Sequence, residues 1–469
     1  MTADLGSPTH PTASNVQEAK PLHVVVLAAG KGTRMRSARP KVLHKIAGRS
    51  LLGHVLHTVR EAGAASLSVV IGPDMDDVRR EALLHAPDAE IFEQPDQRGT
   101  GDAMKAAMPA LERAAAAPGD VIMAFGDTPL LRAPSLGRLR EGLAGGEAVA
   151  VMGFHAGDPT GYGRLLTDEA GHLSAIREHK DASDAERAIT FCNGGVMGFD
   201  ATALPALLRR IGNDNANGEY YLTDAVAIAR ADGRAVSAIA CPEDELLGIN
   251  TRVQLAEAEA VFQARARLAA MEGGVTMISP ESVFLGADTR FGRDVIVEPN
   301  VFFGPGVSVG DDVHIRAHCH IEGASIGDGA RIGPFARLRP GASLAAAVHI
   351  GNFVEVKNVA MAEGAKANHL AYLGDGEVGA KANVGAGTIF CNYDGFNKHR
   401  TVVEAGAFVG SNSALVAPVR IGAGAFVGSG SVISRDVEAD ALALERSPQE
   451  VKPGWAAKFR ALMKRRKAG

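Results

Sequence analysis

The second half of this chain repeats an apolar residue at every sixth position. The spacing holds at Val297, Phe303, Val309, Ile315 and Ile321, and again at Val403, Val409, Leu415, Ile421, Val427 and Ile433. Glycine or another small residue follows most of these positions, in a chain with 55 glycines and only 5% aromatic residues. Such a period, with small residues at the corners, is typical of a parallel β-helix, whose short strands stack into a triangular prism. We therefore predict a left-handed parallel β-helix for this half.

The first half alternates apolar runs with helical stretches. The apolar runs are HVVVLAAG from His23, SLSVVIG from Ser66, DVIMAFGD from Asp120 and EAVAVMGF from Glu147, and we expect helices near Leu51–Ala62 and Met75–Leu84. This β/α alternation predicts a Rossmann-like, mostly parallel sheet covered by helices. Because ligands bind at the carboxyl ends of such strands, the glycine-rich loop after Leu27 and the acid Asp127 should lie at one edge.

The bulk properties exclude several classes of protein. A net charge of −5 gives no general reason to expect nucleic acid as a partner. The four cysteines are far apart and form no CxxC pair, which argues against zinc, against a disulfide framework and for reduced thiols in a cytoplasm. No apolar run approaches the roughly 20 residues that span a bilayer, so we expect no membrane segment.

Composition also predicts the domain boundaries. Residues 1–21 are polar and rich in Pro, Ser and Thr, which predicts a disordered tail. An α/β domain should cover 22–252. The stretch 253–273 is rich in helix formers and lacks Pro, which predicts a connecting helix. The β-helix and a basic C-terminal tail complete the chain over 274–469.

The loop LAAGKGTRM places Gly30 and Gly32 directly after a strand, where backbone N–H groups can approach a polyphosphate. It is neither a dinucleotide-binding GxGxxG loop nor a P-loop. Together with PKVLH from Pro40, RGTGDA from Arg98 and FGD from Phe125, it resembles the sugar-nucleotidyltransferase family. That resemblance implies that Lys41 binds phosphate and that Asp127 binds Mg²⁺.

Later segments narrow the resemblance. They are DPTGYGR, EHKDA, CNGG, GEYYLTD and GINTR, and with the hexapeptide half they make the chain, from residue 22 on, similar to the bacterial bifunctional N-acetylglucosamine-1-phosphate uridylyltransferase and glucosamine-1-phosphate acetyltransferase family. The resemblance implies a site for UTP and the UDP-sugar at Leu27, Ala28, Ala29, Gly30, Lys41, Gln94, Gly99, Thr100, Phe125, Gly126, Asp127, Gly163, Glu178, Asn193 and Asn250. Gln94, Gly99 and Thr100 would read the uracil, and Gly163, Glu178 and Asn193 would hold the sugar. Asn250 would share one Mg²⁺ with Asp127. Gly194 departs from the Thr or Ser that is usual there.

Four segments interrupt the six-residue period: GPFARLRPGA, GNFVEVKN, NHLAYLGD and GAGTIFCNYDGFNKHRT. Breaks in a solenoid often carry function, and acyl transfer to an amine needs a base, an oxyanion donor and a grip on the sugar phosphate. The resemblance implies His369 as the general base, and Arg339, Lys357, Tyr372 and Asn383 around the sugar phosphate. Acetyl-CoA would be lined by Ala386, Asn392, Tyr393, Ser411, Ser429 and Arg446. Asn392 would also orient His369 or the amine, and Tyr393 would also contact the sugar. Ser429 departs from the Ala that is frequent in relatives.

The resulting hypothesis is a cytoplasmic, two-step enzyme. Acetyl-CoA would acetylate glucosamine 1-phosphate, and UTP would then uridylylate the N-acetylglucosamine 1-phosphate so formed. Fold analogy with other left-handed β-helices predicts a homotrimer. Two alternatives remain open at this point. The β-helix could be a non-catalytic appendage of a single-activity nucleotidyltransferase, or it could be an interaction module for a protein partner or surface.

Overall fold

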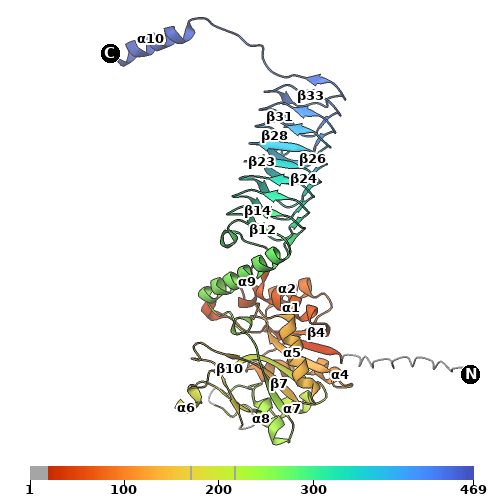
Figure 1. Ribbon diagram of the computed structural model, residues 1–469, viewed down its shortest axis with the longest axis vertical. Helices are drawn as coiled ribbons and strands as arrows, with labels where there is room; N and C mark the ends of the chain where they lie inside the picture. The colour runs from red at the N-terminus through yellow and green to blue at the C-terminus, as the bar shows by residue number, and fades with distance from the viewer. Residues whose placement is uncertain (1–19, 169–171, 216–217, 469) are drawn as a thin grey trace, which may run out of the picture. The chain divides into compact units, whose positions relative to one another are not determined.

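A computed structural model describes residues 20–168, 172–215 and 218–468 (Figure 1). The expected tail, 1–21, lies almost wholly outside these residues. The described residues form two compact units that divide between Phe262 and Gln263, inside the long helix α9 (Arg252–Glu272).

The first unit is built on a sheet with the strand order β11-β7-β10-β6-β1-β4-β5. The strands of this path are β1 (Leu22–Leu27), β4 (Ala64–Ile71), β5 (Glu90–Glu93), β6 (Asp120–Phe125), β7 (Val149–His155), β10 (Phe191–Asp200) and β11 (Val236–Ala240). β8 (Arg164–Thr167) and β9 (Leu173–Arg177) extend the sheet from β10, while β2 (Lys45–Ile46) and β3 (Arg49–Ser50) pair separately. All pairs of the main path are parallel except those of β10, which runs antiparallel to β6 and β7. The expected α/β fold is confirmed.

Helices cover both faces of this sheet (Figure 1). They are α1 (Leu51–Glu61), α2 (Asp76–His85), α3 (Thr100–Ala106), α4 (Met108–Ala114), α5 (Ala133–Ala144), α6 (Asp184–Arg187), α7 (Leu204–Arg210) and α8 (Asp224–Ala231), with 3-10 turns at Thr33–Met35, Lys41–Leu43 and Glu243–Glu245. The helix expected near Leu51–Ala62 is α1, which begins after Ser50 because the Ser50 hydroxyl accepts a hydrogen bond from the Gly53 N–H at 2.9 Å. Its apolar stripe, including Leu52, Val55 and Val59, is fully buried in the core.

The second unit is the predicted parallel β-helix. Its first ladder consists of β12 (Thr276–Met277), β14 (Ile296–Val297), β17 (His314–Ile315), β20 (Arg331–Ile332), β23 (His349–Asn352), β25 (Lys366–His369), β27 (Asn383–Val384), β30 (Phe408–Val409), β33 (Phe426–Val427) and β35 (Leu442–Ala443). The second consists of β15 (Phe302–Phe303), β18 (His320–Ile321), β21 (Arg337–Leu338), β24 (Glu355–Met361), β26 (Tyr372–Val378), β28 (Ile389–Cys391), β31 (Ala414–Val416) and β34 (Val432–Ile433). The third contains β13 (Arg290–Phe291), β16 (Ser308–Val309), β19 (Ala324–Ile326), β22 (Ala342–Leu344), the ends of β24 and β26, β29 (Thr401–Val403) and β32 (Val419–Ile421).

Every strand pair in the three ladders is parallel, and most of the two-residue strands bury one of their two side chains. On the first ladder Val297, Ile315, Ile332 and Ile350 lie above one another and are fully buried. These inward side chains form the single core of the unit. The six-residue period therefore marks the inward positions of a left-handed β-helix, as predicted.

The two ends of the second unit differ in their contacts. At the N-terminal end, the buried Gln263 of α9 exchanges two 2.8 Å hydrogen bonds with the backbone of Leu285. At the C-terminal end, the basic helix α10 (Trp455–Lys467) is exposed along its whole length. Within the described part of the chain, no helix is both long and apolar enough to cross a membrane.

Candidate active sites

A cavity of about 370 Å³ lies at the carboxyl ends of β1 and β6. These strands are paired so that Leu27 lies beside Phe125, and the Gly126 N–H donates to the Leu27 carbonyl at 2.9 Å. The edge expected from the sequence therefore exists. The cavity is lined by Leu27, Ala28, Ala29, Gly30, Lys31, Lys41, Val42, Gln94, Gln97, Gly99, Thr100, Ala103, Phe125 and Asp127.

Lys41 is the point on which the two expected metal ligands converge. Its ammonium donates one hydrogen bond to the Asp127 carboxylate and another, of 2.8 Å, to the Asn250 side-chain oxygen. The two oxygens belong to residues 123 positions apart in the chain, and both accept a hydrogen bond from the same ammonium. Oxygen atoms are also the ligands that Mg²⁺ prefers. Among residues 20–168, 172–215 and 218–468, no three His, Cys, Asp or Glu side chains could hold a metal together. The residues fit an ion that completes its shell with substrate phosphate oxygens.

The segment that contains Gln94 and Gly99 is held in its conformation by internal hydrogen bonds. The buried Gln94 amide donates to the Gly99 carbonyl at 3.0 Å and to the Asp102 carboxylate at 2.7 Å. Gln97, which was not expected in the site, donates to the Ala29 carbonyl at 2.6 Å. This hydrogen bond connects the segment that contains Gln94 and Gly99 to the loop after β1, so two walls of the cavity are joined directly.

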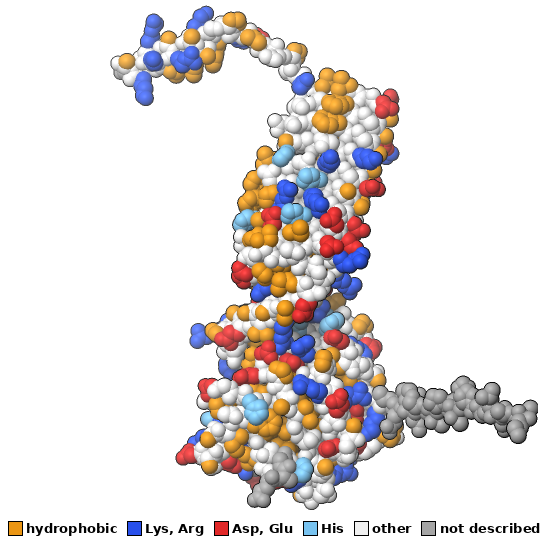
Figure 2. All heavy atoms as spheres, viewed as in Figure 1, with side chains coloured by type: hydrophobic (Ala, Val, Ile, Leu, Met, Phe, Trp, Pro, Cys, Tyr) orange, Lys and Arg blue, Asp and Glu red, His pale blue; other side chains and the backbone are white. Residues whose placement is uncertain are grey.

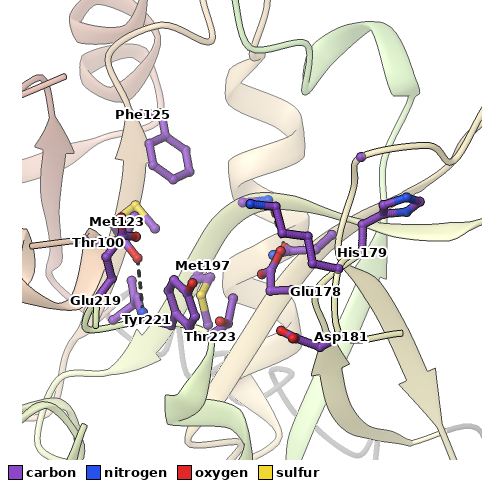
Figure 3. A pocket seen from close by; sticks show the side chains of 16 residues that line it. Thr100, Met123, Phe125, Glu178, His179, Asp181, Met197, Glu219, Tyr221 and Thr223 are labelled. Atoms are coloured by element: carbon purple, nitrogen blue, oxygen red, sulfur yellow. Dashed lines mark hydrogen bonds between the residues drawn. The ribbon is translucent and has the colours of Figure 1, made fainter. Parts of the chain in front are cut away.

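A second cavity of about 350 Å³ adjoins the first, because Gly99, Thr100 and Phe125 line both. Figure 3 shows Thr100, Met123 and Phe125 on one side of it and Glu178 and Asp181 on the other. Glu178 and Asn193, which the sequence analysis expected to hold the sugar, lie in its wall. Gly163 is adjacent, since its carbonyl accepts the Asn193 N–H at 2.7 Å.

The chemistry of this second cavity is acidic. Burial, and then the charges of Asp181 and Asp224, raises the pKa of Glu178 above its usual range. Carboxylate oxygens such as those of Glu178 and Asp181 accept hydrogen bonds from sugar hydroxyls. The cavity therefore suits a neutral polyhydroxylated ligand portion.

The Asn-Gly-Gly departure has a packing explanation. A side chain at Gly194 would meet the Leu246 side chain, and its Cβ would lie 3.1 Å from the Met152 carbonyl oxygen. At Gly195, φ is +83° and an added Cβ would lie 2.6 Å from the Phe125 ring. The Asn193 side-chain oxygen instead accepts the Gly195 N–H at 2.9 Å. Leu246 fills the space that a hydroxyl-bearing side chain would need.

Several lining residues of the second cavity were not named from the sequence. They are Met123, Gly161, His179, Lys180, Asp181, Gly195, Met197, Glu219, Tyr221, Leu222 and Thr223. Most belong to the segments EHKDA and GEYYLTD, whose resemblance to the family was the available signal.

On the β-helix, the expected acetyltransferase residues form a row along successive coils. Gly387 N–H donates to the His369 carbonyl at 3.3 Å, and Asn412 N–H donates to the Ala386 carbonyl at 2.7 Å. Gly430 N–H donates to the Ser411 carbonyl at 2.8 Å, and Arg446 donates to the Ser429 carbonyl at 2.7 Å. His369, Ala386, Ser411 and Ser429 therefore follow one another, with Arg446 at the far end. The contact at Ser429 uses its backbone, which Ala would offer equally.

A buried carboxylate, that of Asp375, contacts several residues near the expected binding site of the sugar phosphate. Asp375 accepts hydrogen bonds from Asn392 at 2.5 Å and from Asn358 at 2.7 Å, and the Lys357 ammonium lies 3.6 Å from it. Burial opposes ionisation of Asp375, but these amides and the charges of Lys357 and Lys398 outweigh it, so its pKa lies below the usual value. Neither Asp375 nor Asn358 was expected from the sequence.

The remaining expected residues surround this centre. Arg339 donates to Glu355 at 2.9 Å, and Tyr372 begins the strand that leads to Asp375. Asn383 begins β27, next to the strand of His369. Tyr393 is 60% exposed and donates to the Gly395 carbonyl at 2.5 Å. Asn392 contacts Asp375 in this structure, whereas the side chain bonded to His369 is that of Asn352.

Comparison with known proteins agrees with this architecture. The family profile for a MobA-like NTP transferase domain matches residues 24–193, and that for bacterial transferase hexapeptide repeats matches residues 288–323 and 400–435. Fold and sites thus define a nucleotidyltransferase domain followed by a hexapeptide-repeat transferase domain. A protein of Azorhizobium caulinodans named "Bifunctional protein GlmU" is 60% identical over 94% of this chain and 97% of its own length.

Two further curated relatives carry the same name. The protein from Bradyrhizobium sp. strain ORS 278 is 57% identical over 93% of this chain and 96% of its own length. That from Xanthobacter autotrophicus is 59% identical over 94% and 97%. The chain belongs to the family of bifunctional GlmU proteins.

Proposed function

We propose that this chain makes UDP-N-acetylglucosamine in two steps. The β-helix transfers the acetyl group of acetyl-CoA to glucosamine 1-phosphate, and the α/β unit joins the product to UTP with release of pyrophosphate. The observation that carries the proposal is that the chain has two separate candidate sites. One is the cavity lined by Lys41 and Asp127 in the first unit, and the other is the row of residues that begins at His369 in the second unit. We assign the first step to residues 274–469 and the second to 22–252.

In uridylyl transfer, a phosphate oxygen of N-acetylglucosamine 1-phosphate attacks the α-phosphorus of UTP. The bond to the β-phosphate breaks, and pyrophosphate leaves. The loop after β1 offers backbone N–H groups to the phosphates, and the Lys41 ammonium supplies a fixed positive charge. Asp127 and Asn250 would hold one Mg²⁺, which when bound neutralises phosphate charge. Glu178 and Asn193 would hold the sugar portion in the adjoining cavity.

In acetyl transfer, the amine of glucosamine 1-phosphate attacks the thioester carbonyl. A C–N bond forms, the C–S bond breaks, and CoA leaves as a thiolate that takes up a proton. His369 would accept the proton that the amine loses. Arg339 and Lys357 offer positive charge to the sugar phosphate. Ala386, Ser411 and Ser429 would line an extended coenzyme, with Arg446 toward its phosphates.

We also propose that the protein is a homotrimer. The row from His369 to Ser429 lies on an open face, and apolar side chains stay exposed at the neighbouring corner. Phe335, Phe353 and Leu370 are 46%, 54% and 60% exposed there. A second copy would cover them and close the site. The four cysteines are free thiols, which supports a cytoplasmic location.

Two variants test the division of labour. His369→Ala should reduce CoA release by at least about 10²-fold, the size expected for loss of a general base, and leave pyrophosphate release from UTP unchanged. Asp127→Ala should do the reverse. Loss of both activities in either variant would contradict the assignment of separate sites. Retained acetyl transfer in His369→Ala would remove the base.

A further inference from the structure

The His369 side chain has one hydrogen-bond partner that the mechanism above does not use. His369 ends β25, Asn352 ends β23, and the two residues face each other in the ladder. The Nδ1 atom of His369 lies 2.8 Å from the side-chain oxygen of Asn352. An amide oxygen accepts a hydrogen bond, so this contact corresponds to a ring that carries its proton on Nδ1. In a neutral imidazole this leaves the lone pair on Nε2.

We propose that Asn352 is a positioning residue for acetyl transfer, which holds His369 in the Nδ1–H tautomer and so presents Nε2 as the proton acceptor. The inference rests on the proposed acetyltransferase function. Fixing a ring through the nitrogen that does not react is the usual way to set which nitrogen does. The contact joins two neighbouring coils, so the solenoid itself fixes its geometry.

The surroundings explain why an amide suits this position. Burial, and then the charges of Arg316, Lys366, Arg331 and His369, lower the pKa of His349, which lies on the same strand as Asn352. On the other side, β27 contributes the neutral Asn383. A carboxylate in place of Asn352 would favour the protonated ring, which cannot accept a proton. The neutral amide orients the ring and leaves it free to act as a base.

Kinetics separate this role from a structural one. Asn352→Asp keeps the acceptor but adds a negative charge, so the acid limb of the pH profile of acetyl-transfer kcat/KM should move up by about one unit. Asn352→Leu removes the acceptor, so kcat should fall at least about tenfold with the KM for acetyl-CoA within about twofold. Asn300→Asp is the matched control, because Asn300 is an exposed Asn of a distant coil. It should leave both the profile and kcat unchanged.

A direct reading of the tautomer needs no activity. In nitrogen-15 NMR of the histidine-labelled full-length protein, with the His369 signals assigned by His369→Gln, Nδ1 should carry the proton at neutral pH. Asn352→Leu should lose that preference. A wild-type ring protonated at Nε2 would overturn the proposal, as would an unmoved pH profile in Asn352→Asp. If the wild-type protein transfers no acetyl group, the proposed function fails, while the NMR signal still decides the tautomer.

Discussion

Gly374 lies where two expected site residues meet. A Cβ added to it would lie 2.5 Å from the Tyr372 hydroxyl oxygen and 2.8 Å from the Asn392 side-chain nitrogen. Ordinary contact begins at 3.4 Å, so the two groups must move by about 0.9 and 0.6 Å, the differences between 3.4 Å and the two distances. Both are ends of side chains, and the fold can survive their displacement. Gly374→Ala therefore perturbs the site more than the scaffold.

The expected effect is large on one activity only. A misplacement of about 1 Å can cost about 10²-fold in rate, so we expect acetyl transfer in Gly374→Ala to fall roughly 10- to 100-fold. Overpacking of this kind should cost about 1–3 kcal/mol of unfolding free energy. Uridylyl transfer, on the other unit, should not change.

The assay is release of CoA thiol with glucosamine 1-phosphate as acceptor, next to pyrophosphate release from UTP. Gly304→Ala is the control, because its Cβ would lie 2.9 Å from the Glu322 Cβ on a coil that carries no expected site residue. It should keep acetyl transfer. Wild-type acetyl transfer in Gly374→Ala, in a folded protein, would refute the placement of Tyr372 and Asn392 at the acceptor.

Further predictions concern the α/β unit. Gly195→Ala should lower uridylyl transfer at least about tenfold, because the new Cβ would press on Phe125 from 2.6 Å, and steady-state pyrophosphate release checks this. Burial lowers the pKa of His54 to about 4. The unfolded chain protonates this residue below about pH 6.5 and the folded one does not, so unfolding takes up a proton and stability falls as pH falls. Between pH 7 and pH 5 the free energy of unfolding should fall by about 2 kcal/mol, as measured by hydrogen exchange of the α1 amides. This decrease should vanish in His54→Gln and persist in His172→Gln, a 67% exposed control.

The fold could be read from the sequence because its periods are physical constraints. An inward residue every six positions is required by a coil of three short strands, and Val297 and Ile315 are buried as that rule demands. The alternation of apolar runs and helices in the first half likewise required a covered sheet. The antiparallel β10 was not foreseen, since an apolar run does not reveal its direction.

The partners within the sites could not be read in the same way. Asn358, Asp375 and Asn392 follow one another at 17 residues, as do Asn352 and His369. A regular coil has three hexads, so these coils are one residue short. The sequence shows where the six-residue period is interrupted, but it does not show which residues of neighbouring coils these interruptions bring side by side. Lys41 and Asn250 are 209 residues apart, and only the folded sheet brings them together.

The most direct test of the hypothesis that this chain has two activities is release of free CoA thiol from acetyl-CoA by the wild-type chain, with glucosamine 1-phosphate present and UTP absent. We expect thiol release that depends on the acceptor and is lost in His369→Ala. No release, with pyrophosphate formation from UTP intact, would contradict the second active site and leave the β-helix as a scaffold for a single-activity nucleotidyltransferase.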